Sequence, residues 1–151
     1  MKNDIQKLAI QFQVLEANLK ELQEKAGILN ERIEEIEKTR TAIEDLEQAK
    51  PSKALIPLGS GNFISGTIEN TDDVIIGIGS GIAIKKKREE AVSILDSKLK
   101  ELEANLNILT DQSTKIAFEL EKIQEEIEKL QKWLNVWFLK EKTKGRNRKN
   151  F

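Results

Sequence analysis

The sequence predicts a mainly α-helical protein with a small β insert, in which an antiparallel two-helix coiled coil flanks two β-hairpins. Two long segments repeat apolar residues in steps of three and four, as coiled-coil helices do. The segment between them is rich in Ile, Val and Gly and contains turn residues at short intervals, which is typical of strands. Only 5% of the residues are aromatic and 34% are charged, a composition that favours long helices over a large compact core.

The first predicted element is a coiled-coil helix within residues 1–50. Asn3 is a candidate N-cap, and Pro51 is expected to end the helix near Ala49. Eleven of its twelve heptad positions are apolar, and Arg40 is the exception. The twelve positions are Ile5, Leu8, Phe12, Leu15, Leu19, Leu22, Ala26, Leu29, Ile33, Ile36, Arg40 and Ile43.

The last predicted regular element is a second coiled-coil helix, over residues 87–139. Its heptad positions are again apolar, with Ser113 as the single polar residue among them. They are Val92, Leu95, Leu99, Leu102, Leu106, Leu109, Ser113, Ile116, Leu120, Ile123, Ile127, Leu130, Leu134 and Trp137. Charged residues fill the other faces of both helices, as the exposed faces of a coiled coil require.

Residues 51–86 predict four short strands arranged as two hairpins, at about 54–58, 62–69, 73–78 and 82–86. The strands carry twelve large apolar residues: Leu55, Ile56, Leu58, Phe63, Ile64, Ile68, Val74, Ile75, Ile76, Ile78, Ile82 and Ile84. We expect no helix of the chain to remain free to cover them, and two hairpins alone are marginally stable in water. All twelve except Ile75 are therefore candidate assembly residues, to be covered by other subunits. A small intramolecular cap on the coiled coil is the alternative.

The two helices are expected to run antiparallel, with facing positions that sum to about 136, to within about one turn. In this register Ile43 meets Val92 and Leu95. Ala26 and Gly27 then lie near Leu109 and Ser113 and form a thin layer, where a bend should be easy.

The segment Trp-Leu-Asn-Val-Trp-Phe-Leu at 133–139 is the strongest candidate binding site. The register places its second half beyond Met1, without a partner helix, and three buried aromatics would cover roughly 450 to 750 Å². Three interpretations stay open: an oligomer contact, docking on a membrane surface, and capture of apolar segments of other proteins, which we favour. The candidate client-binding residues are Ile5, Leu8, Leu130, Trp133, Leu134, Val136, Trp137, Phe138 and Leu139.

Several classes of function are disfavoured by the composition. The chain has no Cys and no His, so it lacks thiolate zinc sites, cysteine nucleophiles and the usual general base. We expect no catalytic residue, no metal, no cofactor and no small-molecule substrate. The glycines of 77–81 precede a strand rather than a helix, which favours a turn over a nucleotide-binding loop.

Residues 140–151 form a basic tail with six Lys or Arg and one Glu. A disordered, solvated tail is the preferred interpretation, and nucleic-acid or membrane binding is the less favoured one. The sequence shows no signal peptide and no membrane span, so we expect a cytoplasmic protein.

The insert resembles a known family. Leu55-Ile56-Pro57-Leu58-Gly59-Ser60-Gly61-Asn62-Phe63-Ile64-Ser65-Gly66-Thr67-Ile68, followed by Ile76-Gly77-Ile78-Gly79-Ser80-Gly81-Ile82-Ala83-Ile84, is similar to the strand region of archaeal-type prefoldin alpha-class subunits. With the flanking heptads, the resemblance covers about residues 4 to 139.

The resemblance implies an ATP-independent chaperone, a holdase, whose partners are beta-class prefoldin subunits, unfolded client proteins and a group II chaperonin. It implies a hexamer of two alpha-class and four beta-class chains. The hairpins would join its oligomeric β-barrel body, and the coiled-coil tips would hold clients. The alternative is a structural coiled-coil scaffold whose apolar tip is only an oligomer contact.

Overall fold

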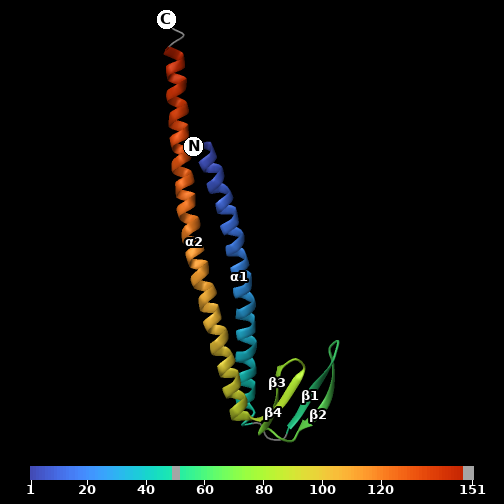
Figure 1. Ribbon diagram of the computed structural model, residues 1–151. Helices are drawn as coiled ribbons and strands as arrows, with labels where there is room; N and C mark the ends of the chain where they lie inside the picture. Colours follow the sequence, from blue (N-terminus) through green and yellow to red (C-terminus); the bar gives the residue numbers. More distant parts are fainter. Residues whose placement is uncertain (49–51, 148–151) are drawn as a thin grey trace. The chain divides into compact units, whose positions relative to one another are not determined.

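The computed structural model describes residues 1–48 and 52–147. The elements follow in the order α1 (Lys2–Asp45), β1 (Ser52–Gly59), β2 (Asn62–Ile68), β3 (Asp73–Gly79), β4 (Ile82–Lys87) and α2 (Arg88–Asn147) (Figure 1). The predicted fold class of two long helices around two antiparallel hairpins is confirmed. The chain divides into two compact units, which we describe separately: unit 1 contains residues 1–27 and the chain from 107 onward, and unit 2 contains residues 28–106.

The heptad positions of both helices are the positions that the fold covers. In α1 all twelve predicted positions are partly or fully buried, Leu46 continues the series just after the helix, and every other residue of the helix is exposed. In α2 every predicted position from Val92 to Leu134 is likewise covered, whereas Trp137 is exposed. Each helix therefore presents one stripe to the other, as an amphipathic coiled-coil helix should.

Unit 2 contains the best-buried part of the coiled coil. Ile36 of α1 packs with Leu95 and Leu99 of α2, and Ile33, Ile43 and Leu102 extend this cluster. These are γ-branched and β-branched side chains at heptad spacing, which interdigitate across a helix pair. The cluster shows that Ile36 is placed as the heptad pattern predicts.

Arg40, the polar exception in the first array, has a specific partner in unit 2. Its buried Nε forms an ion pair with Asp96 Oδ1 at 2.5 Å. A terminal guanidinium nitrogen of Arg40 also lies 3.4 Å from Glu44 Oε1. Positions 40 and 96 sum to 136, so the predicted register is confirmed in this unit. A polar pair inside a coiled-coil seam disfavours slipped registers.

Unit 1 contains the other halves of the two helices, which are again paired antiparallel. Leu120 and Ile123 of α2 are buried. Phe12 of α1 lines a shallow groove together with Gln124 and Ile127 of α2. These positions lie within about one turn of the predicted register.

The two hairpins repeat one geometry with an offset of twenty residues. Hairpin 1 (β1 and β2) pairs Ile56 with Ile64, and hairpin 2 (β3 and β4) pairs Ile76 with Ile84. Both turns read Gly-Ser-Gly, and their φ angles are 112°, 49° and 77° in hairpin 1 and 108°, 53° and 72° in hairpin 2. Left-handed backbone at the two loop residues is what tight hairpins require. All four strands begin and end within two residues of the predicted bounds.

Hairpin 2 corrects the expectation that no helix of the chain covers the strands. Ile76 is only 7% exposed. It lines a groove of 210 Å³ in unit 2 with Ile36 and Ile43 of α1 and Leu95 of α2. Ala91, next to the heptad stripe of α2, is also fully buried. The expectation failed because it assigned the covered stripe of each helix wholly to the other helix, whereas Ile36, Ile43 and Leu95 of those stripes also line the groove beside Ile76.

The ends of the helices differ in two places from the sequence prediction. Helix α1 is capped two residues before the expected cap at Asn3, because the carbonyl of Met1 accepts hydrogen bonds from the N–H groups of Asp4 (3.1 Å) and Ile5 (3.2 Å). The predicted stop at Ala49 and Pro51 lies outside the described residues.

Helix α2 continues to Asn147, so residues 140–147 are helical and not a disordered tail. This stretch contains Lys and Glu, which favour helix, and it has no proline. Basic residues in the last turn, Lys144 and Arg146, complement the helix dipole. Residues 148–151 of the predicted tail lie outside the described residues.

Candidate functional site

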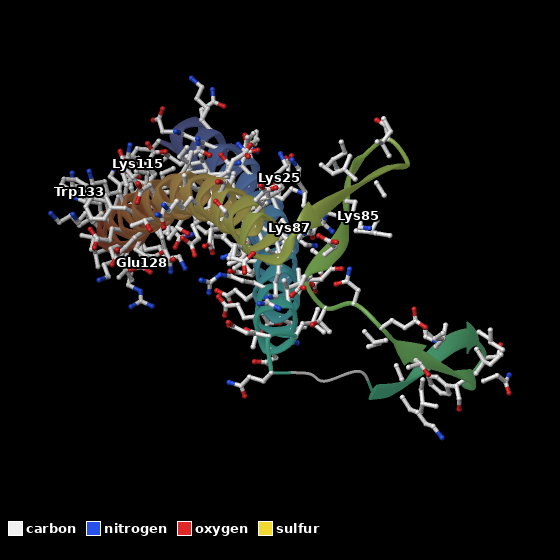
Figure 2. All side chains as sticks on the ribbon, turned by 90° about the horizontal axis from the view of Figure 1, so that it is seen from below. Lys25, Lys85, Lys87, Lys115, Glu128 and Trp133 are labelled. Atoms are coloured by element: carbon white, nitrogen blue, oxygen red, sulfur yellow. The ribbon has the colours of Figure 1, made fainter. Side chains whose placement is uncertain are left out.

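Five large apolar side chains near the end of α2 are exposed, and we call them the apolar collar: Trp133, Val136, Trp137, Phe138 and Leu139. Trp133 is 67% exposed, and it lies among side chains that radiate from α2 (Figure 2). The rings of Trp137 and Phe138 meet edge to face with centroids 5.4 Å apart. At 100° per residue, Trp133, Phe138 and Leu139 point in directions about 100 to 140° apart, so the collar surrounds the helix.

Four collar residues lie outside the heptad stripe of α2, and Trp137, which is at a heptad position, lies where α1 no longer covers that stripe. Within unit 1, α2 extends beyond the first residue of α1 (Figure 1). The other predicted client-binding residues, Ile5, Leu8, Leu130 and Leu134, are half-buried along the seam. The nine candidates thus comprise four seam residues and five collar residues.

The hairpins expose most of the predicted assembly residues. Seven of the eleven are exposed: Leu55, Ile56, Leu58, Phe63, Ile64, Ile78 and Ile82. Ile68, Val74 and Ile84 are half-buried, and Ile76 is buried. Ile75, which we did not choose as a candidate, is the most exposed of the large hydrophobic residues, and its place on the opposite face of β3 from Ile76 was available from the strand alternation.

Each hairpin is a separate two-stranded sheet, so its outer backbone edges are unpaired within the described chain. Hairpin 1 has the larger uncovered face, because Ile56 is 49% exposed whereas its equivalent Ile76 is buried. Unpaired strand edges beside exposed apolar side chains favour pairing with another chain.

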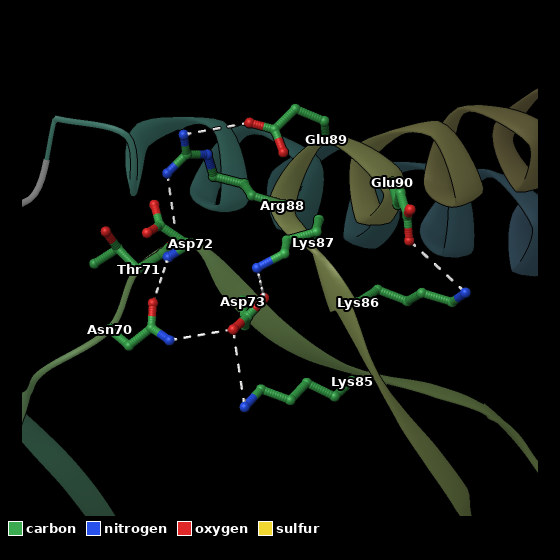
Figure 3. Close-up of polar contacts among 10 residues, drawn as sticks. All are labelled: Asn70, Thr71, Asp72, Asp73, Lys85, Lys86, Lys87, Arg88, Glu89 and Glu90. Atoms are coloured by element: carbon green, nitrogen blue, oxygen red, sulfur yellow. Dashed lines mark hydrogen bonds and ion pairs between the residues drawn. The ribbon is translucent and has the colours of Figure 1, made fainter.

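Arg88, at the start of α2, connects three segments of unit 2 (Figure 3). Its backbone N–H donates to the carbonyl of Asp72 (2.9 Å), and its guanidinium donates to the carbonyl of Thr71 (3.2 Å). The guanidinium also lies 3.8 Å from a carboxylate oxygen of Glu47, which follows α1. We did not predict this arrangement from the sequence.

Asp73 opens β3 and is held by two lysines of β4 (Figure 3). Lys87 Nζ lies 2.9 Å from one carboxylate oxygen and Lys85 Nζ lies 3.8 Å from the other. The hydrogen bond from Lys87 is the main cause that lowers the pKa of Asp73, and the same contact raises the pKa of Lys87. The group stabilises the open end of hairpin 2, and the lowered pKa of Asp73 is the opposite of the raised pKa that a general-acid carboxylate needs.

Neither surface resembles a catalytic or metal site. Among residues 1–48 and 52–147, no three Asp or Glu side chains are grouped so as to hold a metal ion. The described helices also contain no stretch that is apolar and long enough to cross a bilayer. What the geometry does offer is apolar surface on a helix end and on two hairpins, which defines a protein-binding coiled-coil subunit.

Comparisons with known proteins agree with this class. The family profile "Prefoldin subunit" matches residues 15–133, and the chain belongs to this family, as an alpha-class subunit of the archaeal type. The prefoldin subunit alpha of Pyrococcus horikoshii is 34% identical over 100 residues, which cover 65% of this chain and 68% of the relative. That of Methanobrevibacter smithii is 36% identical over 86 residues, covering 57% and 59%.

A solved structure has the same fold. The filamentous prefoldin of Methanocaldococcus jannaschii superposes with a TM-score of 0.67 at 20% sequence identity, over 76% of this chain and 95% of that one. Family membership gives the chain a chaperone-type role, in a family whose members are not enzymes.

Proposed function

We propose that this chain is a subunit of a cytoplasmic, ATP-independent holdase that captures unfolded proteins on the apolar collar and transfers them to a group II chaperonin. Its hairpins join beta-class prefoldin subunits in a hexamer of two alpha-class and four beta-class chains. Membership of the family supports the chaperone role. The two exposed surfaces support separate roles for the collar, in client binding, and for the hairpins, in assembly.

The exposed collar is the observation that carries the proposal. Two Trp and one Phe stand exposed within six residues of one helix. Three such side chains offer roughly 450 to 750 Å², whereas the largest apolar patch of a typical monomer is about 300 to 600 Å². A side chain of this size is normally buried unless it contacts a partner.

The shape of the collar suits unfolded chains better than one folded partner. A folded partner covers one face of a helix, but the collar presents apolar side chains on all faces. Such a surface binds by area and reads no particular sequence, as promiscuous binders do. No residue of the collar needs a nucleotide to become accessible, which agrees with binding that is independent of ATP.

The hairpins support the proposed assembly. A two-stranded hairpin is marginally stable by itself, and hairpin 1 exposes Leu55, Leu58 and Phe63 with little cover from its own chain. Neighbouring strands would bury these side chains and pair the free edges, which is how a barrel removes edges.

Suppression of the aggregation of a denatured enzyme tests the proposal, with the chain assembled with a beta-class subunit. The test variant carries Trp133→Ser, Trp137→Ser and Phe138→Ser. The control variant carries Ile28→Ser, Ile108→Ser and Phe118→Ser, which changes three exposed apolar side chains outside the collar.

We expect the test variant to lose most of the suppression while its oligomeric mass in native mass spectrometry stays unchanged, and the control to retain both. A chain ending at Lys132 should behave as the test variant does. Loss of the oligomer on removing the collar would instead support the scaffold alternative, and full suppression without the collar would refute client capture there.

A further inference from the structure

The apolar collar is bracketed by positive charge on both sides. Lys129 and Lys132 precede it, and four basic residues follow it on the helical turns that replace the predicted disordered tail: Lys140, Lys142, Lys144 and Arg146. Glu141 is the single acidic residue from 129 to 147. By contrast, the preceding stretch 119–128 contains five Glu and one Lys. The positive charge is thus local to the collar.

These six cations are available to a ligand. All six side chains are exposed, and none forms an ion pair with another described residue. The start of α1 does not neutralise them, because Asp4 there is paired with the amino terminus at 3.2 Å.

Cationic and apolar atoms share the same shallow grooves. Lys142 lines one groove with Asn135, Phe138 and Leu139. It lines a second groove with Leu139 and Arg146 among others. A peptide side chain that rests on Phe138 or Leu139 therefore has an ammonium group within reach, and the lysine stem adds apolar surface of its own.

We propose that the end of α2 selects, among unfolded chains, those whose apolar segments are flanked by acidic residues. This inference rests on the proposed function and specifies its substrate class. The collar supplies contact area, and the flanking cations attract carboxylates on either side of the bound segment. Like-charged, basic flanks are disfavoured by the same field.

The distribution of side chains favours a peptide over a membrane or a nucleic acid. A helix that lies on a membrane separates an apolar face from a basic face. Here both kinds of residue surround the helix: Lys140 and Lys142 lie about 200° apart, and the collar covers all faces. Sites for single-stranded nucleic acid stack successive bases on aromatic side chains along a basic groove, whereas the two grooves that Lys142 lines contain one aromatic residue, Phe138.

Binding of three labelled peptides tests the preference. They share one apolar core, Leu-Phe-Val-Leu-Ile, flanked on each side by two Glu, two Gln or two Lys. Dissociation constants are measured by fluorescence anisotropy on the full chain, assembled with a beta-class subunit, at 50 mM and 1 M salt.

At 50 mM salt we expect the Glu-flanked peptide to bind about five- to tenfold more tightly than the Gln-flanked one, since each exposed ion pair contributes a small increment. The Lys-flanked peptide should bind most weakly. At 1 M salt, where the Debye length is about 3 Å, the ratio should approach one.

The matched variants locate the effect. Gln substitutions at Lys140, Lys142, Lys144 and Arg146 should remove most of the preference, so that the Glu-flanked and Gln-flanked peptides bind with similar affinity, because only Lys129 and Lys132 remain of the six cations. Gln substitutions at Lys20, Lys38, Lys100 and Lys115 change the net charge equally elsewhere on the exposed helix surface, where Figure 2 shows Lys115, and should preserve it.

Equal binding of all three peptides at low salt would overturn the charge preference and leave client capture standing. Failure of all three to bind would refute the proposed function itself. The inference would also be overturned, in favour of a phosphate-binding role, by tight binding of a single-stranded oligonucleotide or of anionic vesicles without any peptide preference. That binding would have to disappear in the variant with Gln at Lys140, Lys142, Lys144 and Arg146.

Discussion

Shortening Ile36 to Ala tests the helix pairing in unit 2. Ile36 is 7% exposed and packs against Leu95 and Leu99. The substitution Ile36→Ala removes three buried carbon atoms, which at about 0.8 kcal/mol each costs about 2.4 kcal/mol. Alanine recovers about 0.4 kcal/mol through its higher helix propensity.

The remaining contribution is the cavity that the substitution leaves. Ile36 already borders the 210 Å³ groove beside hairpin 2, so the new space opens to solvent instead of forming a closed void. The expected loss is therefore about 2 to 3 kcal/mol of unfolding free energy, in the lower part of the range for buried Ile→Ala changes.

Ile28→Ala is the matched control, because Ile28 lies on the same helix in the same unit and is 67% exposed. It should change the stability by less than about 0.5 kcal/mol. Both variants are unfolded in urea at one protein concentration and followed by far-UV circular dichroism, since the stability of an oligomer depends on concentration. Equal costs at Ile36 and Ile28, or a cost below about 1 kcal/mol at Ile36, would refute the assigned buried stripe.

Three further predictions concern backbone and charge. Gly27→Ala should raise the stability by about 1 kcal/mol in thermal unfolding, because Gly27 lies inside α1 and a Cβ there meets nothing within 4 Å; a loss would contradict the open surroundings. Gly59→Ala should lower stability by about 1 kcal/mol or more, because φ at Gly59 is 112°. Gly77→Ala is the control and should be nearly neutral, because Gly77 has no positive φ and a Cβ there meets nothing within 4 Å. In the folded protein Lys87 lowers the pKa of Asp73. The Asp73 carboxylate therefore stabilises the fold fully above its unfolded pKa, near 4. This stability is lost as the pH falls through the lower pKa that Asp73 has in the folded state. Asp73→Asn should therefore show a shallower loss of stability than the parent protein in unfolding curves recorded from pH 5 down to pH 2, and identical slopes would count against the Asp73–Lys87 contact.

The helices were the most predictable part of the fold. The steps of three and four identified every covered residue of α1, because burial in a two-helix coiled coil depends on a single angular coordinate along the sequence. The pattern also placed Trp137 beyond the partner helix, since the register follows once the two helices are known to be antiparallel. The same register places Asp96 opposite Arg40, but we did not predict this ion pair from the sequence.

The errors arose at contacts that the angular position of a residue around its helix does not determine. The cover of Ile76 depends on how hairpin 2 packs beside Ile36, Ile43 and Leu95, and this contact leaves no periodic signal in either segment. The extension of α2 to Asn147 was missed because a run of Lys was interpreted as disordered, although nothing between Leu139 and Gly145 breaks a helix. The collar and the hairpin faces were recognised as surfaces, but their partners belong to other chains and are not encoded in the pattern of this one.

The twenty-residue repeat of the Gly-Ser-Gly turn gives one chain two hairpins of the same backbone design, which are the two attachment elements of the proposed assembly. A chain with a single such element can only terminate a series of contacts. With two, it can stand between two neighbours and act as a branch point, so that rings and longer arrays become geometrically accessible. Because Ile76 is covered by helices of its own chain while Ile56 is 49% exposed, the two elements share a backbone design but differ in the apolar surface that they offer to a neighbour.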